Sequence, residues 1–168
     1  MTSLKTRGIY YKIYTYFPII FLLISVLNEF DFNYLNLDYF SFNFPYILIF
    51  YFALKEYNKF DYLLVFIAGL FNDTVVGLPL GISSFSYILV CIFASYLRNI
   101  TIRPHLIKDW FYFLFVISLI NSIKFSILFL FFSYELDIMF YIINNLFTFL
   151  LYVPSSYILN YYFKALND

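Results

Sequence analysis

Long apolar runs, separated by short polar segments, repeat from Ile13 almost to the C-terminus of this 168-residue chain. About 20 apolar residues cross the hydrocarbon of a bilayer as a helix. In this chain 64% of the residues are hydrophobic and only 12% are charged, which leaves little polar surface for a water-soluble domain. The sequence therefore predicts an all-α membrane protein that forms one multi-pass domain over residues 1–168.

Six apolar segments are predicted to be transmembrane helices. They cover residues 11–27, 44–54, 62–71, 82–97, 110–133 and 138–163. The second and third segments are too short for a full crossing, so we expect each to be tilted, to use polar flanking residues or to enter the membrane halfway. The first segment follows basic residues, as in a signal peptide, but no small-residue cleavage site follows it. We interpret it as an uncleaved span.

Charged residues are sorted between the two sides of the predicted helices. If the N-terminus is cytoplasmic, nine of the ten basic residues fall on the cytoplasmic side, and the outer segments contain acids instead. Cytoplasmic loops near membrane ends collect Lys and Arg, so this sorting predicts six crossings with both termini in the cytoplasm. The cytoplasmic basic residues are Lys5, Arg7, Lys12, Lys55, Lys59, Arg98, Arg103, Lys108 and Lys164, and the outer acids are Glu29, Asp31, Asp38, Asp73, Glu135 and Asp137.

The string GLFNDTVVGLPLG, residues 69–81, interrupts the apolar pattern with three of the four glycines of the chain. Irregular backbone is tolerated at membrane depth only where protein or trapped water satisfies its polar groups. Gly69 permits a close approach of helices, Gly77 and Gly81 permit positive φ, and Pro79 fixes its own φ. The motif therefore predicts a short helix, a compact turn near the outer membrane edge and a helix that returns inward.

Asp73 lies inside this motif and has two main interpretations. It is either a hydrated acid at the membrane edge or an acid whose side chain binds backbone amides and fixes the turn. A substrate or proton role is a third possibility, since intramembrane acids are often functional. After the motif, Ser83 and Ser84 are expected to satisfy the first free amides of the next helix. The outer position of the motif favours a structural corner over a substrate site.

Lys124 is the one basic residue that does not fall on the predicted cytoplasmic side, and it lies within the fifth predicted helix. It lies nine residues before Ser133, or roughly 14 Å below the outer end of the helix at 1.5 Å per residue. Asn144 and Asn145 lie at a similar depth on the returning helix. We therefore predict that Lys124 faces the interior and bonds one of these asparagines, or a water that they hold. The alternative is a side chain that extends towards the headgroups.

No catalytic or metal-binding motif is recognisable in the sequence. The one histidine, His105, lies on a predicted cytoplasmic loop, and the one cysteine, Cys91, lies in an apolar run. The HExxH, P-loop and GxSxG patterns and a Cys/His cluster do not occur. We therefore expect a protein that is not an enzyme and has no cofactor and no nucleic-acid partner. The basic loop from Arg98 to Lys108 is expected to contact anionic lipid headgroups, or alternatively a cytoplasmic filament.

The motif resembles a pattern of the MreD family of bacterial rod shape-determining membrane proteins, which has G-L-x-x-D-x-x-x-G-x-P-L-G at this place. The apolar segment and short basic loop before it, the chain length, the six crossings and Pro154 in the last helix are also similar to that family. The matching motif positions are Gly69, Leu70, Asp73, Gly77, Pro79, Leu80 and Gly81.

This resemblance implies a component of the bacterial inner membrane that takes part in lateral cell-wall elongation. It also implies a fold similar to the six-helix substrate-binding subunits of energy-coupling-factor transporters. The implied partners are the periplasmic coiled-coil scaffold MreC, the actin-like filament MreB, a glycan polymerase and a penicillin-binding transpeptidase. We therefore expect a non-catalytic scaffold that determines rod shape by regulating peptidoglycan synthesis. The alternative is a small-solute-binding subunit of a transporter, because interrupted helices often line transport sites.

Overall fold

The computed structural model describes residues 20, 22–24, 42–55, 61–101, 105–134 and 138–167, with side chains described up to residue 161. All regular structure in these residues is helical, which confirms the predicted all-α class for this part of the chain. Most of the predicted first segment, residues 11–27, lies outside the described residues. The five longer helices described are α2 (Phe44–Lys55), α3 (Tyr62–Val76), α4 (Ile82–Ile100), α5 (Leu106–Phe132) and α6 (Ile138–Asn167).

The predicted end of α3 is wrong, whereas the other ends of these helices lie within four residues of prediction. Instead of stopping at residue 71, α3 continues to Val76 and contains Asn72 and Asp73. Gly77 ends it with a left-handed φ of 73°, a common conformation after the last helical residue. The sequence predicts that this polar pair ends the helix. In the structure both residues are buried on the inner face of α3.

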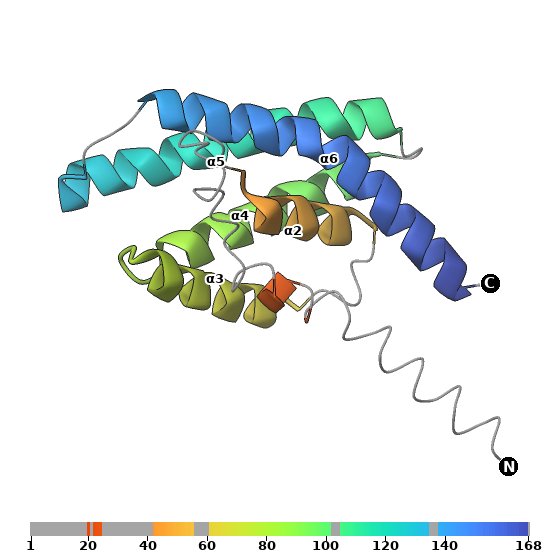
Figure 1. Ribbon diagram of the computed structural model, residues 1–168, viewed down its shortest axis with the longest axis horizontal. Helices are drawn as coiled ribbons and strands as arrows, with labels where there is room; N and C mark the ends of the chain where they lie inside the picture. The colour runs from red at the N-terminus through yellow and green to blue at the C-terminus, as the bar shows by residue number, and fades with distance from the viewer. Residues whose placement is uncertain are drawn as a thin grey trace, which may run out of the picture.

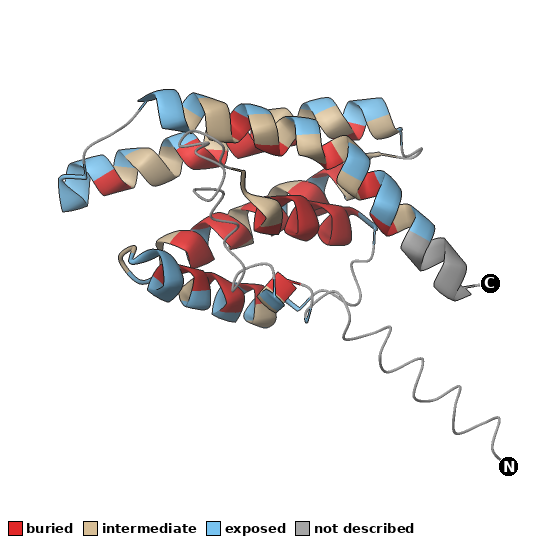
Figure 2. Ribbon diagram, in the orientation of Figure 1, coloured by how far each residue is buried: buried red, intermediate tan, exposed pale blue. Residues whose placement is uncertain are grey.

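The helix α2 lies between the pair α3 and α4 and the pair α5 and α6 (Figure 1). It contacts α4 and α6, while α4 also contacts α3 and α5. All of residues 45–54 are buried, so α2 exposes none of its sides over this stretch (Figure 2). A helix that is hydrophobic all round is typical of a position inside other elements. This central position explains why α2 has no polar face.

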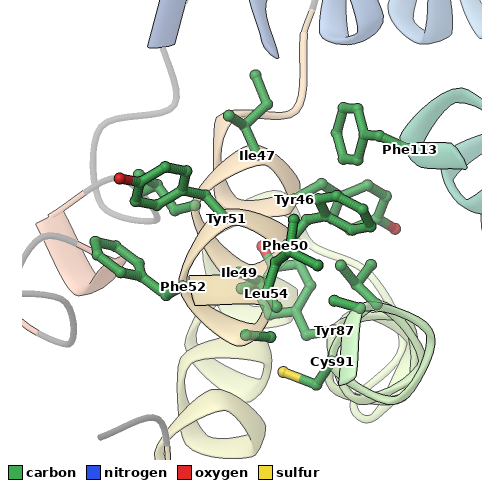
Figure 3. Packing of buried hydrophobic residues seen from close by; sticks show 14 of the residues in the cluster. Tyr46, Ile47, Ile49, Phe50, Tyr51, Phe52, Leu54, Tyr87, Cys91 and Phe113 are labelled. Atoms are coloured by element: carbon green, nitrogen blue, oxygen red, sulfur yellow. The ribbon is translucent and has the colours of Figure 1, made fainter. Parts of the chain in front are cut away.

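Aromatic side chains fill the space between α2 and its neighbours. The ring of Phe50 lies 4.9 Å from the ring of Phe113 on α5 and 5.7 Å from the ring of Tyr152 on α6, measured between centroids. Tyr46 packs edge-on against Tyr87 of α4 at 5.7 Å (Figure 3). Such ring pairs contribute about 0.5–1.5 kcal/mol each beyond their buried area. These contacts fix the central helix against three others.

Apolar side chains cover much of the surface of the described helices, and several polar ones are buried. On α5 the exposed fraction reaches 77% at Phe131 and 72% at Leu130. Large exposed apolar surfaces are uncommon on water-soluble monomers. The buried polar and charged residues are Asn72, Asp73, Ser83, Ser84, Ser86, Ser95, Asp109, Asn121, Asn145, Thr148 and Ser156.

Two helices in the described part of the chain, α5 and α6, are long and apolar enough to cross a membrane by length and composition. Their candidate spans are Leu106–Phe132 and Ile138–Tyr161, and α2 and α3 are shorter apolar helices. The structure therefore agrees with the prediction of a membrane protein, as far as the length and composition of these two helices go. Six crossings and two cytoplasmic termini stay predictions.

Candidate functional site

The motif at residues 69–81 forms the turn between α3 and α4, which we call the corner. A Cβ atom on Gly69 would lie 2.3 Å from the Cα atom of Ser84. Because this distance is far below any real contact, only glycine permits the observed spacing of the two helices. Gly77 and Gly81 have φ values of 73° and 102°, a region that disfavours any residue with a side chain. All three predicted roles of the glycines are confirmed.

The Asp73 side chain connects the end of α3 to the start of α4. Its Oδ2 atom accepts a hydrogen bond from the Gly81 N–H at 2.7 Å, and its Oδ1 atom accepts one from the Ser83 N–H at 2.8 Å. Its main-chain oxygen accepts from the N–H groups of Gly77 and Leu78. The first amides of a helix are otherwise unpaired and form the positive end of the helix dipole. One aspartate therefore closes α3 and caps α4.

Burial decides between the two main interpretations of Asp73. Its exposed fraction is 0%, so the interpretation as a hydrated acid at the membrane edge is wrong. A buried charge is tolerated when polar groups bond it, and both carboxylate oxygens are bonded here. The interpretation as an amide-binding acid that fixes the turn is confirmed.

Ser83 and Ser84 do not cap their own helix, so that prediction is wrong. Ser83 Oγ accepts from Asn72 Nδ2 at 2.9 Å, and Ser84 Oγ donates to the Phe66 main-chain oxygen at 2.9 Å. Serine is a favoured cap, but the carboxylate of Asp73 already binds an early amide of α4. The serine hydroxyls instead join α4 to α3.

Asn72 is a corner residue that sequence reasoning did not single out. It is buried, as are Gly69 and Asp73 on the same helix. The available signal was its spacing, since residues three apart lie on the same face of a helix. The other motif positions lie nearer the surface: Leu70 is partly buried, and Leu80 is 71% exposed.

A second group of polar side chains joins α5 to α6. Asn121 Nδ2 donates to Asn145 Oδ1 at 2.8 Å, and both residues are buried. The hydroxyl oxygens of Ser122 and Tyr141 lie 2.9 Å apart. Such interhelical hydrogen bonds in membranes contribute about 0.6–2 kcal/mol each. These bonds hold together two helices whose outer surfaces are apolar.

Lys124 is half-buried beside this group. Asn145, one of its two predicted partners, is bonded instead to Asn121. Counted in residues from the outer ends of the two helices, Asn145 lies at about the same depth as Lys124. The amide of Asn121, however, lies deeper in the α5–α6 contact and pairs with Asn145. A bond from Lys124 to Asn144 stays a prediction, and a Lys124→Leu variant with unchanged abundance and activity would contradict a role for the charge.

Pro154 lies inside α6, which bends along its length (Figure 1). A proline within a helix lacks the N–H that the carbonyl four residues earlier would bind, and it causes a kink. Trp110 Nε1 of α5 donates to the main-chain oxygen of Phe149 at 2.8 Å, and the two rings stack at 4.5 Å. The indole therefore supplies a hydrogen bond close to the proline and fixes α6 against α5.

The polar groups of the corner are bonded to one another, which suits the corner to fix the geometry of a helix pair. Among the described residues there is no group of three or more His, Cys, Asp or Glu side chains that could hold a metal ion. Cys91 is buried, and His105 is exposed at the start of α5. No protein-family model, no curated protein and no solved structure matches this chain.

Proposed function

We propose that this protein is a non-catalytic membrane scaffold of the bacterial cell-wall elongation machinery, as the resemblance of its motif to the MreD family implies. The geometry of the corner carries the proposal. The distinctive residues of the motif have structural roles there. Gly69 permits the close approach of α3 and α4, Gly77 and Gly81 have left-handed backbone conformations, and the Asp73 carboxylate binds backbone amides. Because this geometry requires these residue types at this spacing, a shared pattern is a reason to expect a shared corner.

The distribution of polar and apolar side chains supports a place in the inner membrane. Lipid solvates apolar surface, whereas polar groups in a membrane need partners within the protein. The described helices follow this rule, with exposed phenylalanines on α5 and buried, bonded groups such as Asp73 and Asn121. In the proposal the corner lies at the periplasmic edge and both termini lie in the cytoplasm, as the basic residues predict.

A scaffold has to present its partners with surfaces in fixed relative positions. Fully bonded polar networks rigidify a structure, and at the corner such a network joins α3 to α4. The central α2 helix and its aromatic contacts then hold this pair against α5 and α6. We propose that the periplasmic side binds an MreC-like coiled coil and the cytoplasmic side an MreB-like filament. The glycan polymerase and the penicillin-binding transpeptidase are the enzymes positioned in this way.

A small-solute-binding transporter subunit is the second candidate function. One observation favours it: a buried acid lies where the chain leaves one helix and enters another, and such interruptions often form transport sites. Two observations oppose it. Both carboxylate oxygens of Asp73 bind amides of the same chain, and the side chains of α2 fill the middle of the bundle with hydrocarbon. The scaffold is therefore the better supported proposal.

Depletion of the protein in its host separates the two functions. The scaffold proposal expects rod-shaped cells to become round while solute uptake stays normal. Rod-shaped cells with a defect in solute uptake would refute the scaffold and support the transporter subunit.

Capture of the coiled-coil partner tests the corner directly. A Gly81→Leu variant places a side chain at a φ of 102°, and Pro79→Leu removes the fixed φ of the turn. Both should recover less partner than Cys91→Ala, which changes a buried residue of α4 away from the corner. The three variants are compared at equal abundance in the membrane. Equal recovery of the partner by all three would contradict the proposed role of the corner.

A further inference from the structure

The turn of the corner contains no side chain that ionises. From Thr74 to Leu97 the chain has no charged residue and no histidine, and residues 77–81 read GLPLG. The outer connection between α5 and α6, by contrast, contains Glu135 and Asp137. A charged side chain is costly in hydrocarbon. The composition of this turn therefore permits it to lie within a membrane.

Apolar side chains form the outer surface of the corner and continue along α3. Leu80, at the tip of the turn, is 71% exposed. Exposed apolar side chains recur at every fourth residue of α3 (Figure 2), and we call them the α3 stripe: Leu63, Ile67, Phe71 and Val75. Residues four apart lie on the same face of a helix. The apolar surface therefore runs without a charged side chain along one face of α3 towards the corner.

Main-chain groups of the turn are bonded within the protein. Asp73 alone accepts from four N–H groups, two with its carboxylate and two with its main-chain oxygen. The Ile82 N–H donates to the Pro79 main-chain oxygen at 3.3 Å, and Pro79 itself has no N–H. The exposed Thr74 hydroxyl donates to the Phe71 main-chain oxygen at 2.7 Å. Irregular backbone is tolerated in hydrocarbon where the protein satisfies its polar groups in this way.

The length of α3 limits how far the corner reaches across a bilayer. The helix has 15 residues, which span about 22 Å at 1.5 Å per residue, whereas the hydrocarbon is about 30 Å thick. In the proposed orientation α3 starts at the inner surface, where Lys55 and Asp61 are exposed and charged. A helix that starts there ends roughly 8 Å short of the outer headgroups, and any tilt increases the shortfall.

We propose that the tip of the corner is immersed in the hydrocarbon of the periplasmic leaflet, where lipid acyl chains cover Leu80 and the α3 stripe. The inference rests on the membrane placement in the proposed function and makes it more specific, since the turn lies below the headgroups. A water-soluble periplasmic domain has no direct access to such a turn. The corner then acts on a periplasmic partner through the positions of α3 and α4.

Spin-label depth measurements on the full chain in lipid nanodiscs test this placement. Leu80→Cys and Val75→Cys are each labelled in a Cys91→Ala background. The collision rate of each label with oxygen, which concentrates in hydrocarbon, is compared with its collision rate with a water-soluble nickel complex. We expect both labels to collide more often with oxygen than with nickel.

Two positions on α5 and at its end calibrate the measurement. Phe115→Cys labels a position within α5 that is 58% exposed, and it is the control for hydrocarbon. Tyr134→Cys labels an exposed position that follows α5 and precedes the charged outer connection, and it is the control for the outer surface. The ratio of the two collision rates at Leu80 should lie closer to the ratio at Phe115 than to the ratio at Tyr134.

The other outcomes separate this inference from the proposed function. Nickel access at Leu80 and Val75, with Phe115 still shielded from nickel, would overturn the immersion and leave the membrane placement intact. A label at Leu80 that neither reagent reaches would overturn it as well, because protein would then cover the tip. Nickel access at Phe115 too would refute the membrane placement on which both proposals depend.

Discussion

Replacement of Asp73 by alanine tests how the corner is held. The carboxylate accepts hydrogen bonds from the N–H groups of Gly81 and Ser83 at 2.7 and 2.8 Å. Hydrogen bonds to charged groups contribute about 1.5–3 kcal/mol each, so Asp73→Ala is expected to lower the free energy of unfolding by about 3–6 kcal/mol. The loss is large because the two amides stay in the turn without their acceptor.

The Asp73→Asn variant gives an intermediate result for a different reason. Asparagine has the same size and keeps one acceptor oxygen, so it retains one of the two hydrogen bonds. Its NH₂ group, however, faces the second backbone N–H, and two donors oppose each other. The loss of one charge-assisted bond together with the favourable charge at the helix start lowers the free energy of unfolding by about 2–4 kcal/mol.

The assay is denaturant unfolding of the purified protein in detergent micelles or nanodiscs, monitored by far-ultraviolet circular dichroism. Asp61→Ala is the matched control, since Asp61 is an exposed cap of α3 that accepts from the Leu63 N–H at 3.0 Å. Loss of such a cap lowers the free energy of unfolding by about 1 kcal/mol. If Asp73→Ala costs no more than Asp61→Ala, the buried carboxylate does not hold the corner and the reasoning is refuted.

Two further substitutions test the packing of the helices. Gly69→Ala brings a Cβ against the Ser84 backbone, so we expect a loss of about 1–3 kcal/mol from overpacking in the same unfolding assay. Gly77→Ala meets no atom within 4 Å but has a φ of 73°, so strain alone should cost about 1–2 kcal/mol; an unchanged free energy of unfolding in either variant would contradict the role given to that glycine. Asn145→Ala leaves the buried amide of Asn121 without its acceptor and should cost about 0.6–2 kcal/mol. A double-mutant cycle with Asn121→Ala measures the coupling, and additive losses would show that the two amides do not interact.

Features that depend on local chemistry could be predicted from the sequence. The starts of α2, α3, α4 and α6 agree with prediction. The apolar runs, and the polar or glycine-containing segments between them, can be recognised from the sequence alone. The left-handed backbone at Gly77 and Gly81 and the close approach at Gly69 were also predictable. In each case the absence of a Cβ atom is a property of the residue itself.

Only the tertiary structure decided which polar groups meet. Whether Asp73 is hydrated or bonded depends on the amides of Gly81 and Ser83, eight and ten residues further along the chain, and their position follows from how α4 packs on α3. The partner of Asn145 was decided in the same way, by the face of α5 that turns towards α6. The sequence by itself determined the helices and the turn, because local conformation depends on nearby residues. Burial and hydrogen bonding between helices depend on groups distant in the chain, and only the folded bundle brings those together.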